Sequence, residues 1–188
     1  QLALSQSENQ TLRQNLDALL GAPTAARGDV PSGPTKEDHL DEPESVADAV
    51  SFAQDQTKHL IFLESAVESA SESPYRTPSR ALQALQAIDE VAGLWVHGLA
   101  GGENPGPLKA LFRQRGFEYK DDISQTSRGK WGAEYEAKYN GQTIDVSPHI
   151  TIGAKQADTC LSVHMHWDKE SKKVVIAHVG RHKTNTKT

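Results

Sequence analysis

The feature that most constrains the fold is a pair of strand-like segments close together in the last third of the sequence. Apolar and polar residues alternate over 161–168, which is the period of a strand with one buried face. Residues 173–179 form a continuous run rich in β-branched side chains, and 169–172 can form the turn between the two segments. Because short connections join antiparallel strands, we predict an antiparallel hairpin here.

Histidine is concentrated in the same part of the chain, since five of the eight histidines lie in residues 149–188. The alternation puts His164 and His166 on the polar face of the first strand, and His178 can lie beside them on the second. His149 opens a shorter segment that also resembles a strand. The pattern therefore predicts that four histidines converge on one solvent-exposed face of a sheet.

Three interpretations of this histidine face remain open. One imidazole could take the proton of a ribose 2′-hydroxyl while another protonates the leaving 5′ oxygen, which cleaves RNA without a metal. Alternatively, His164 and His166 could be two ligands of a transition metal, with His149, His178 or Asp168 completing the set. The third interpretation is that these are ordinary exposed strand histidines.

Charge is distributed unevenly along the chain. Residues 1–104 contain 6 Lys and Arg against 16 Asp and Glu, whereas residues 105–188 contain 14 against 9. Only the second part of the chain therefore suits RNA or another polyanion. The residues that we predict to contact such a substrate are Arg128 and Lys130, in an expected flexible loop at 121–131, together with Lys173 and Lys183.

The order of the predicted elements indicates an α+β fold in which helices precede an antiparallel sheet. Apolar spacing predicts helices in the first part of the chain, the main one beginning at Thr77-Pro78. A strand is expected at 59–63. We then predict a meander of about five strands, which lie at 130–140, 142–146, 149–153, 161–168 and 173–179. Asn140-Gly141 would form its first hairpin turn.

Composition divides the chain into segments. Residues 1–20 carry leucines at helical spacing and could end a coiled coil, through which the chain could bind a protein partner or itself. Residues 21–42 have the composition of a flexible linker. We predict that 43–188 form the α+β domain, with a helical part at 43–116 and a sheet part at 117–188.

The stretch VVIAHVGRH at 174–182, with a preceding strand and a basic tail, resembles the C-terminal half of the RelE/ParE-type toxin superfamily. The resemblance covers about 158–185. It implies a small α+β domain that cleaves mRNA without metal, in which Arg181, His182 and His178 contact the scissile phosphate. The chain departs from that family in having no tyrosine in its tail.

Several classes of function find no support in the sequence. A single cysteine, Cys160, excludes an internal disulfide, and we expect it to be buried. No glycine-rich phosphate loop, apolar membrane span or targeting segment is present, so we predict a cytoplasmic fragment of a longer protein without a cofactor. The leading hypothesis is an RNA-binding domain with metal-independent endoribonuclease activity, as in a toxin or defence effector. The alternatives are a non-catalytic interaction module of a coiled-coil protein and a histidine-rich metal enzyme.

Overall fold

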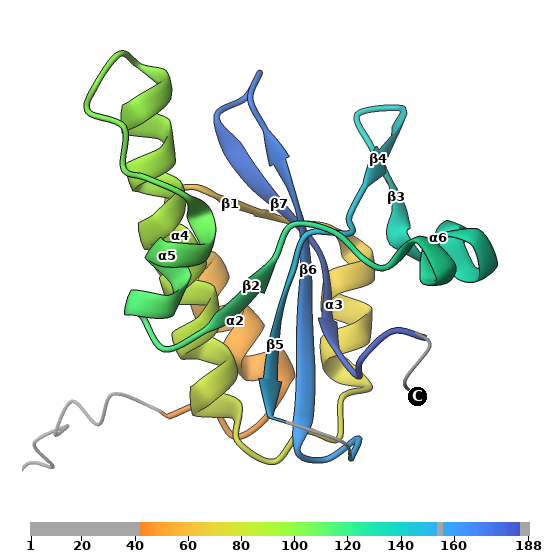
Figure 1. Ribbon diagram of the computed structural model, residues 1–188. Coiled ribbons are helices and arrows are strands. Elements are labelled where there is room, and N and C mark those ends of the chain that lie inside the picture. Colours follow the sequence, from red (N-terminus) through yellow and green to blue (C-terminus); the bar gives the residue numbers. More distant parts are fainter. Residues whose placement is uncertain (1–41, 154–155, 185–188) are drawn as a thin grey trace, which may run out of the picture. The chain divides into compact units, whose positions relative to one another are not determined.

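The computed structural model of the chain describes residues 42–153 and 156–184 (Figure 1). These residues form an α+β fold, as predicted. The helices are α2 (Val46–Gln56), α3 (Glu64–Ser71), α4 (Pro78–Leu99), α5 (Leu108–Gln114) and α6 (Gln125–Trp131), which runs into the short 3-10 helix η1 (Gly132–Tyr135). The strands are β1 (Leu60–Phe62), β2 (Glu118–Lys120), β3 (Glu136–Tyr139), β4 (Gln142–Asp145), β5 (His149–Gly153), β6 (Cys160–Asp168) and β7 (Lys173–Gly180).

Five strands form the main sheet in the order β1-β7-β6-β5-β2. The predicted hairpin of β6 and β7 is confirmed, and every neighbour pair is antiparallel except β1 with β7. The predicted meander is wrong in its membership, because β3 and β4 pair only with each other in a separate small sheet. The short edge strand β2 has no counterpart in the prediction. The expected coiled coil at 1–20 and nearly all of the linker at 21–42 lie outside the described residues.

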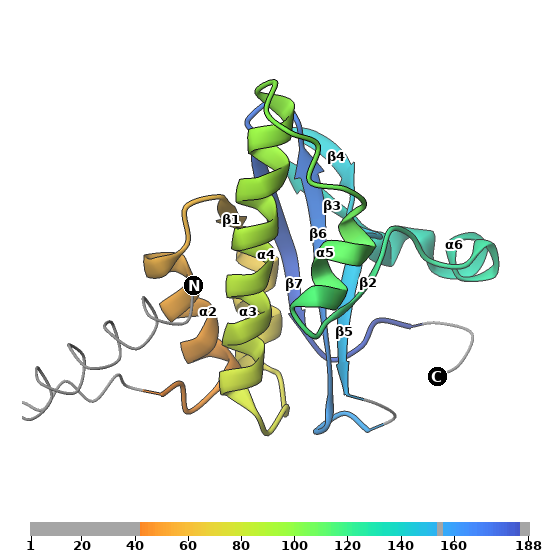
Figure 2. The same cartoon turned by 60° about the vertical axis from the view of Figure 1, so that its left-hand side comes forward.

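Helices α2 and α4 cover one face of the main sheet, and α3 packs along the edge of β7 (Figure 2). The capping box of Ser45 and Asp48 starts α2, and Pro78 occupies the first turn of α4. The alternating apolar residues of the strands point toward these helices and form the core with them. The polar residues of β5, β6 and β7 therefore lie on the opposite face.

The edge of β7 beyond β1 is closed by α3. The Leu63 N–H donates to the Ile176 carbonyl at 2.9 Å, and the Ser65 hydroxyl donates to the Ala177 carbonyl at 2.8 Å. The Val179 N–H donates to the Ser69 hydroxyl at 3.0 Å. Backbone groups that an open edge would leave to solvent are thus satisfied by a helix.

Gly180 permits this close approach of α3 to the strand. A Cβ atom at Gly180 would lie 2.6 Å from the Ser69 carbonyl oxygen, whereas nothing lies within 4 Å of one at Gly129 in α6. We therefore expect Gly180→Ala to lower the free energy of unfolding by about 1–3 kcal/mol, because the backbone must move. Gly129→Ala should be neutral or slightly stabilising. Urea unfolding of both variants tests this, and equal stability of the two would contradict it.

The segment between β2 and β5 differs most from the prediction. Residues expected to form a loop and a long strand instead form α6, whose N-cap hydroxyl at Ser124 accepts a hydrogen bond from the Ser127 N–H. Only the end of the expected strand is extended, as β3. The predicted turn is confirmed: Asn140 and Gly141 both have positive φ angles, of 49° and 77°. No helix among the described residues has the length and apolar character needed to cross a membrane.

Candidate functional site

The polar face of the main sheet carries a row of side chains that crosses four strands. The strand register pairs Lys120 with His149, His149 with His164, and His164 with His178. Residues paired in this way project from the same face, so one lysine and three histidines form a continuous line. We call these four residues the histidine row.

The imidazole rings of the row are in contact. The ring centroids of His149 and His164 lie 4.8 Å apart in a stacked arrangement, and those of His164 and His178 lie 5.6 Å apart edge to face. The His182 ring meets His149 edge to face at 6.2 Å. The predicted convergence of histidines is therefore present for His149, His164 and His178, and His182 joins it.

The expectation that this face is open to solvent is wrong. His164 is fully buried and His149 is 4% exposed. The buried Tyr135 ring packs 5.5 Å from that of His164, and the chain from Asp145 to Ser147 lies over the row. Strand alternation indicates which residues share a face, but it carries no information about what covers that face.

Three consecutive backbone carbonyls fix the orientation of three histidines. The carbonyls of Asp145, Val146 and Ser147 accept hydrogen bonds from the Nδ1 atoms of His166, His164 and His149, at 3.0, 3.0 and 2.7 Å respectively. A carbonyl can only accept, so each Nδ1 carries the proton. When these imidazoles are neutral, their Nε2 atoms carry the lone pair. The buried Nε2 of His164 has no hydrogen-bond partner among the described residues.

Burial determines the charge of the row. It lowers the pKa of His149, and it holds the pKa of His164 well below the ordinary value of 6.5. Burial also lowers the pKa of His178 to about 4. The neighbouring histidines and Lys183 act in the same direction on His164, because each would repel a second positive charge. The three histidines of the row are therefore neutral at pH 7.

Arg128 holds the segment that covers the row. Its Nη2 atom hydrogen-bonds the carboxylates of Asp122 and Asp145 and the hydroxyl of Ser147. Asp145 in turn accepts from the Ser147 N–H at 2.9 Å. The structure thus places Arg128, predicted to contact substrate, in a network that supports the carbonyls above His164 and His149.

We expect Arg128→Met to lower the melting temperature by a few degrees. The segment from Asp145 to Ser147, which covers the row, then loses the guanidinium that donates to both Asp145 and Ser147. Arg76→Met is the matched control, since the exposed Arg76 side chain forms a single ion pair, with Asp158. Its loss should change the melting temperature less. Thermal unfolding followed by circular dichroism compares the two, and an equal or smaller effect at Arg128 would contradict the role given to it.

His178 is the member of the row that reaches a pocket. The pocket has a volume of about 360 Å³ and lies between β3, the start of α3 and the end of β7. His178 is half-buried, and its Nε2 donates to the Arg181 carbonyl at 2.8 Å. No hydrogen bond joins its Nδ1 to another described residue. The neutral ring therefore keeps an available lone pair on Nδ1.

Lys183 lines the same pocket and comes from the tail that follows β7. Its Nζ donates to the Glu134 carbonyl at 2.6 Å, and the Tyr135 hydroxyl donates to the Thr184 carbonyl at 2.7 Å. These two contacts tie the tail to η1. Burial lowers the pKa of Lys183, while Glu134 partly opposes this. Arg181, the residue after β7, is exposed.

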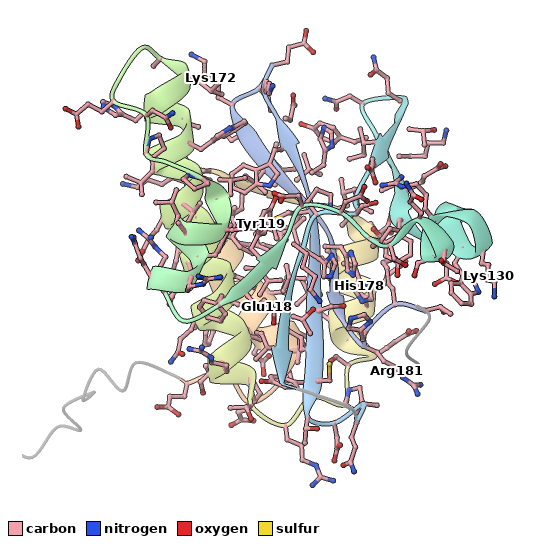
Figure 3. All side chains as sticks on the ribbon, in the orientation of Figure 1. Glu118, Tyr119, Lys130, Lys172, His178 and Arg181 are labelled. Carbon is pink, nitrogen blue, oxygen red and sulfur yellow. The ribbon has the colours of Figure 1, made fainter. Side chains whose placement is uncertain are left out.

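Three predicted site residues lie away from His178. Lys173 lies at the opposite end of β7, where its Nζ donates to the Lys58 carbonyl. Lys130 lies on α6, with its Nζ 5.7 Å from the centre of the Trp131 ring (Figure 3). His166 is half-buried and pairs with Val175 of β7. It lies two residues beyond His164 on β6, outside the row.

The structure adds pocket residues that the sequence analysis missed. Glu64 and Ser65 come from the start of α3, and Glu136 and Lys138 from β3. Parallel pairing of β1 with β7 brings α3 to this place from more than 100 residues away in sequence, so no local pattern could indicate it. Ser124 is the N-cap of α6, the helix that leads through η1 to β3, and this capping residue could have been recognised in the sequence.

The metal-site interpretation finds no support in the geometry. Within residues 42–153 and 156–184, no three His, Cys, Asp or Glu side chains are grouped so that they could hold a metal ion. Cys160 is buried, as expected. Comparison of the chain with protein-family models, with curated proteins and with solved structures found no match. The proposed role of the site therefore depends on its chemistry.

Proposed function

We propose that this domain cleaves RNA without a metal ion, in the pocket beside His178. The observation that carries the proposal is that a neutral imidazole with an available Nδ1 and the ammonium group of Lys183 line one pocket. The first group can accept a proton and the second can donate one. RNA cleavage by its own 2′-hydroxyl requires these two steps.

The reaction would proceed in one displacement at phosphorus. His178 Nδ1 takes the proton of the ribose 2′-hydroxyl, whose oxygen then bonds to the adjacent phosphorus. The bond from phosphorus to the 5′ oxygen breaks, and Lys183 gives a proton to that leaving oxygen. The products are a 2′,3′-cyclic phosphate and a free 5′-hydroxyl. Because burial lowers the pKa of Lys183, its proton is easier to transfer than that of an exposed lysine.

Lys183 is able to serve in this role while it holds the tail. One of its three N–H donors is used by the Glu134 carbonyl, which leaves two for a phosphate oxygen or a leaving group. Arg181 is exposed beyond the end of β7 and adds a second positive charge in this part of the chain. Arg181 is not among the residues that line the pocket, so we assign it a long-range attraction for RNA and no contact with the reacting phosphorus.

The pocket itself is balanced in charge. Glu64 and Glu136 line it together with Lys138 and Lys183. Two carboxylates and two ammonium groups suit proton transfer, but they give little net attraction to a polyanion. An RNA substrate would therefore require further contacts outside the pocket.

The proposal is tested with the purified domain and an end-labelled single-stranded RNA in EDTA. We expect cleavage that leaves a 2′,3′-cyclic phosphate, and resistance of the same oligonucleotide when 2′-deoxy nucleotides replace the ribose at the cleavage sites. Equal cleavage of the deoxy substrate would overturn the mechanism. If the domain binds RNA and leaves it intact, the activity is wrong and a non-catalytic RNA-binding module takes its place.

A further inference from the structure

We propose that a hollow between α5 and β2 is a second RNA-binding site, which holds phosphates a few nucleotides from the one that is cleaved. This inference rests on the proposed function and supplies the contacts that the charge-balanced pocket lacks. The hollow has a volume of about 490 Å³. Three cationic side chains line it, and these are Lys109, Arg113 and Lys120.

The three cations come from two elements that pack together. Lys109 and Arg113 are four residues apart on α5, so they project from the same side of the helix. Lys120 ends β2, which contacts α5. Phe117 and Tyr119 also line the hollow, and both are buried under it. The base of the hollow is therefore formed by buried aromatic side chains, and its edge carries the three cations.

One residue that lines the hollow, Glu118, is a carboxylate, and Glu118 and Asp121 hold these cations only weakly. Lys109 pairs with Asp121 at 2.8 Å, and Lys120 pairs with Glu118 at 3.8 Å. All four of these side chains are about half exposed or more, and exposed ion pairs contribute little free energy. Arg113 is exposed, and no ion pair joins it to another described residue. The cations can therefore turn to phosphate oxygens at small cost.

The hollow adjoins the far end of the histidine row from the catalytic pocket. Lys120 is the first residue of that row and His178 the last. Three strand-to-strand intervals separate them, which is about 14 Å. Figure 3 shows Glu118, the neighbour of Tyr119 on β2, and His178 on opposite sides of β5 and β6. A single RNA strand that runs across the sheet, over the segment from Asp145 to Ser147 that covers the row, could reach both sites, whereas a very short RNA could occupy only the pocket.

The test compares two variants of equal charge change. In the first, Lys109→Gln, Arg113→Gln and Lys120→Gln remove the cations of the hollow. In the control, Lys58→Gln, Arg76→Gln and Lys169→Gln remove three exposed cations elsewhere. Binding of a labelled single-stranded RNA of about ten nucleotides is followed by fluorescence anisotropy at several salt concentrations.

We expect the hollow variant to bind this RNA at least about tenfold more weakly than the control, with a salt slope smaller by about 2 for three lost phosphate contacts. Cleavage of a dinucleotide, which reaches only the pocket, should fall by a much smaller factor than cleavage of the ten-nucleotide RNA. Equal binding by the two variants would overturn the second site, as would wild-type protein that binds no RNA. Wild-type protein that binds RNA through the hollow but cleaves none would support the second site and refute the catalytic proposal.

Discussion

The domain is expected to lose stability steeply as the pH falls from about 6.5 toward 4. Burial lowers the pKa of His149, His164 and His178 in the folded state, so the unfolded chain takes up protons first. Their contribution to stability is therefore complete above the unfolded value of 6.5 and is lost as the pH falls toward the folded values. Each group contributes up to about 1.4 kcal/mol per pH unit, and whole domains are stable by only about 5–15 kcal/mol.

Carboxylates act in a different pH window. The hydrogen bonds of Ser147 and the charge of Arg128 lower the pKa of Asp145 despite its burial, and the Ser171 hydroxyl lowers that of Asp168. Their contribution is present above the ordinary value of 3.8 and is lost only below it. Loss of stability at pH 5 or 6 would therefore come from the histidines.

Urea unfolding at several pH values between about 7.5 and 5 measures this effect. His164→Gln is the informative variant, because glutamine cannot take up the proton. It should be less stable than wild type at neutral pH but lose stability less steeply as the pH falls. His97→Gln is the control, since His97 is exposed near the end of α4. A wild-type free energy that stays constant over this range would contradict the buried, neutral row.

His178→Ala is expected to reduce RNA cleavage by about 10²- to 10⁴-fold, the usual contribution of a general base. The fold should persist, because His178 lies at the half-buried end of the row and its partner, the Arg181 carbonyl, can turn to water. Lys183→Met should reduce cleavage as well, since the leaving oxygen then lacks its proton donor. The rates are measured under single-turnover conditions, beside melting temperatures.

Two matched variants separate chemistry from structure in this experiment. His97→Ala removes an exposed histidine and Lys169→Met an exposed lysine, and neither residue lines the pocket. Neither should change the cleavage rate. If His178→Ala cleaves RNA as fast as His97→Ala, then His178 is not the base, and the row has a structural role only.

The local patterns of the sequence predict the helices before β2 and the central hairpin well. Apolar spacing identifies α2 and α4. The alternation over β6 places His164 and His166 on one face, and the strand register puts His178 of β7 beside His164 on that face. These features succeed because each depends on residues close in sequence. The parallel pairing of β1 with β7 depends on residues more than 100 positions apart, and the sequence pattern cannot supply it.

The region from α6 to β3 shows how an alternating pattern can mislead. Aromatic residues at every second or fourth position, such as Trp131 and Tyr135, fit a strand, yet here they belong to a helix and a 3-10 turn. Tyr135 is buried because it covers His164, and that contact exists only once the segment folds back over the sheet. The chemistry of the site was thus predictable in residue type, while its burial was not.

The protonation state of His178 underlies both the acid lability and the proposed catalysis. Long-range nitrogen–proton NMR spectra of histidine-labelled domain report the pKa and the tautomer of each imidazole. We predict that His178 is neutral at pH 7, carries its proton on Nε2 and titrates near pH 4, while His149 and His164 carry theirs on Nδ1. A His178 that titrates at its ordinary value of 6.5, or that carries its proton on Nδ1, would contradict the account.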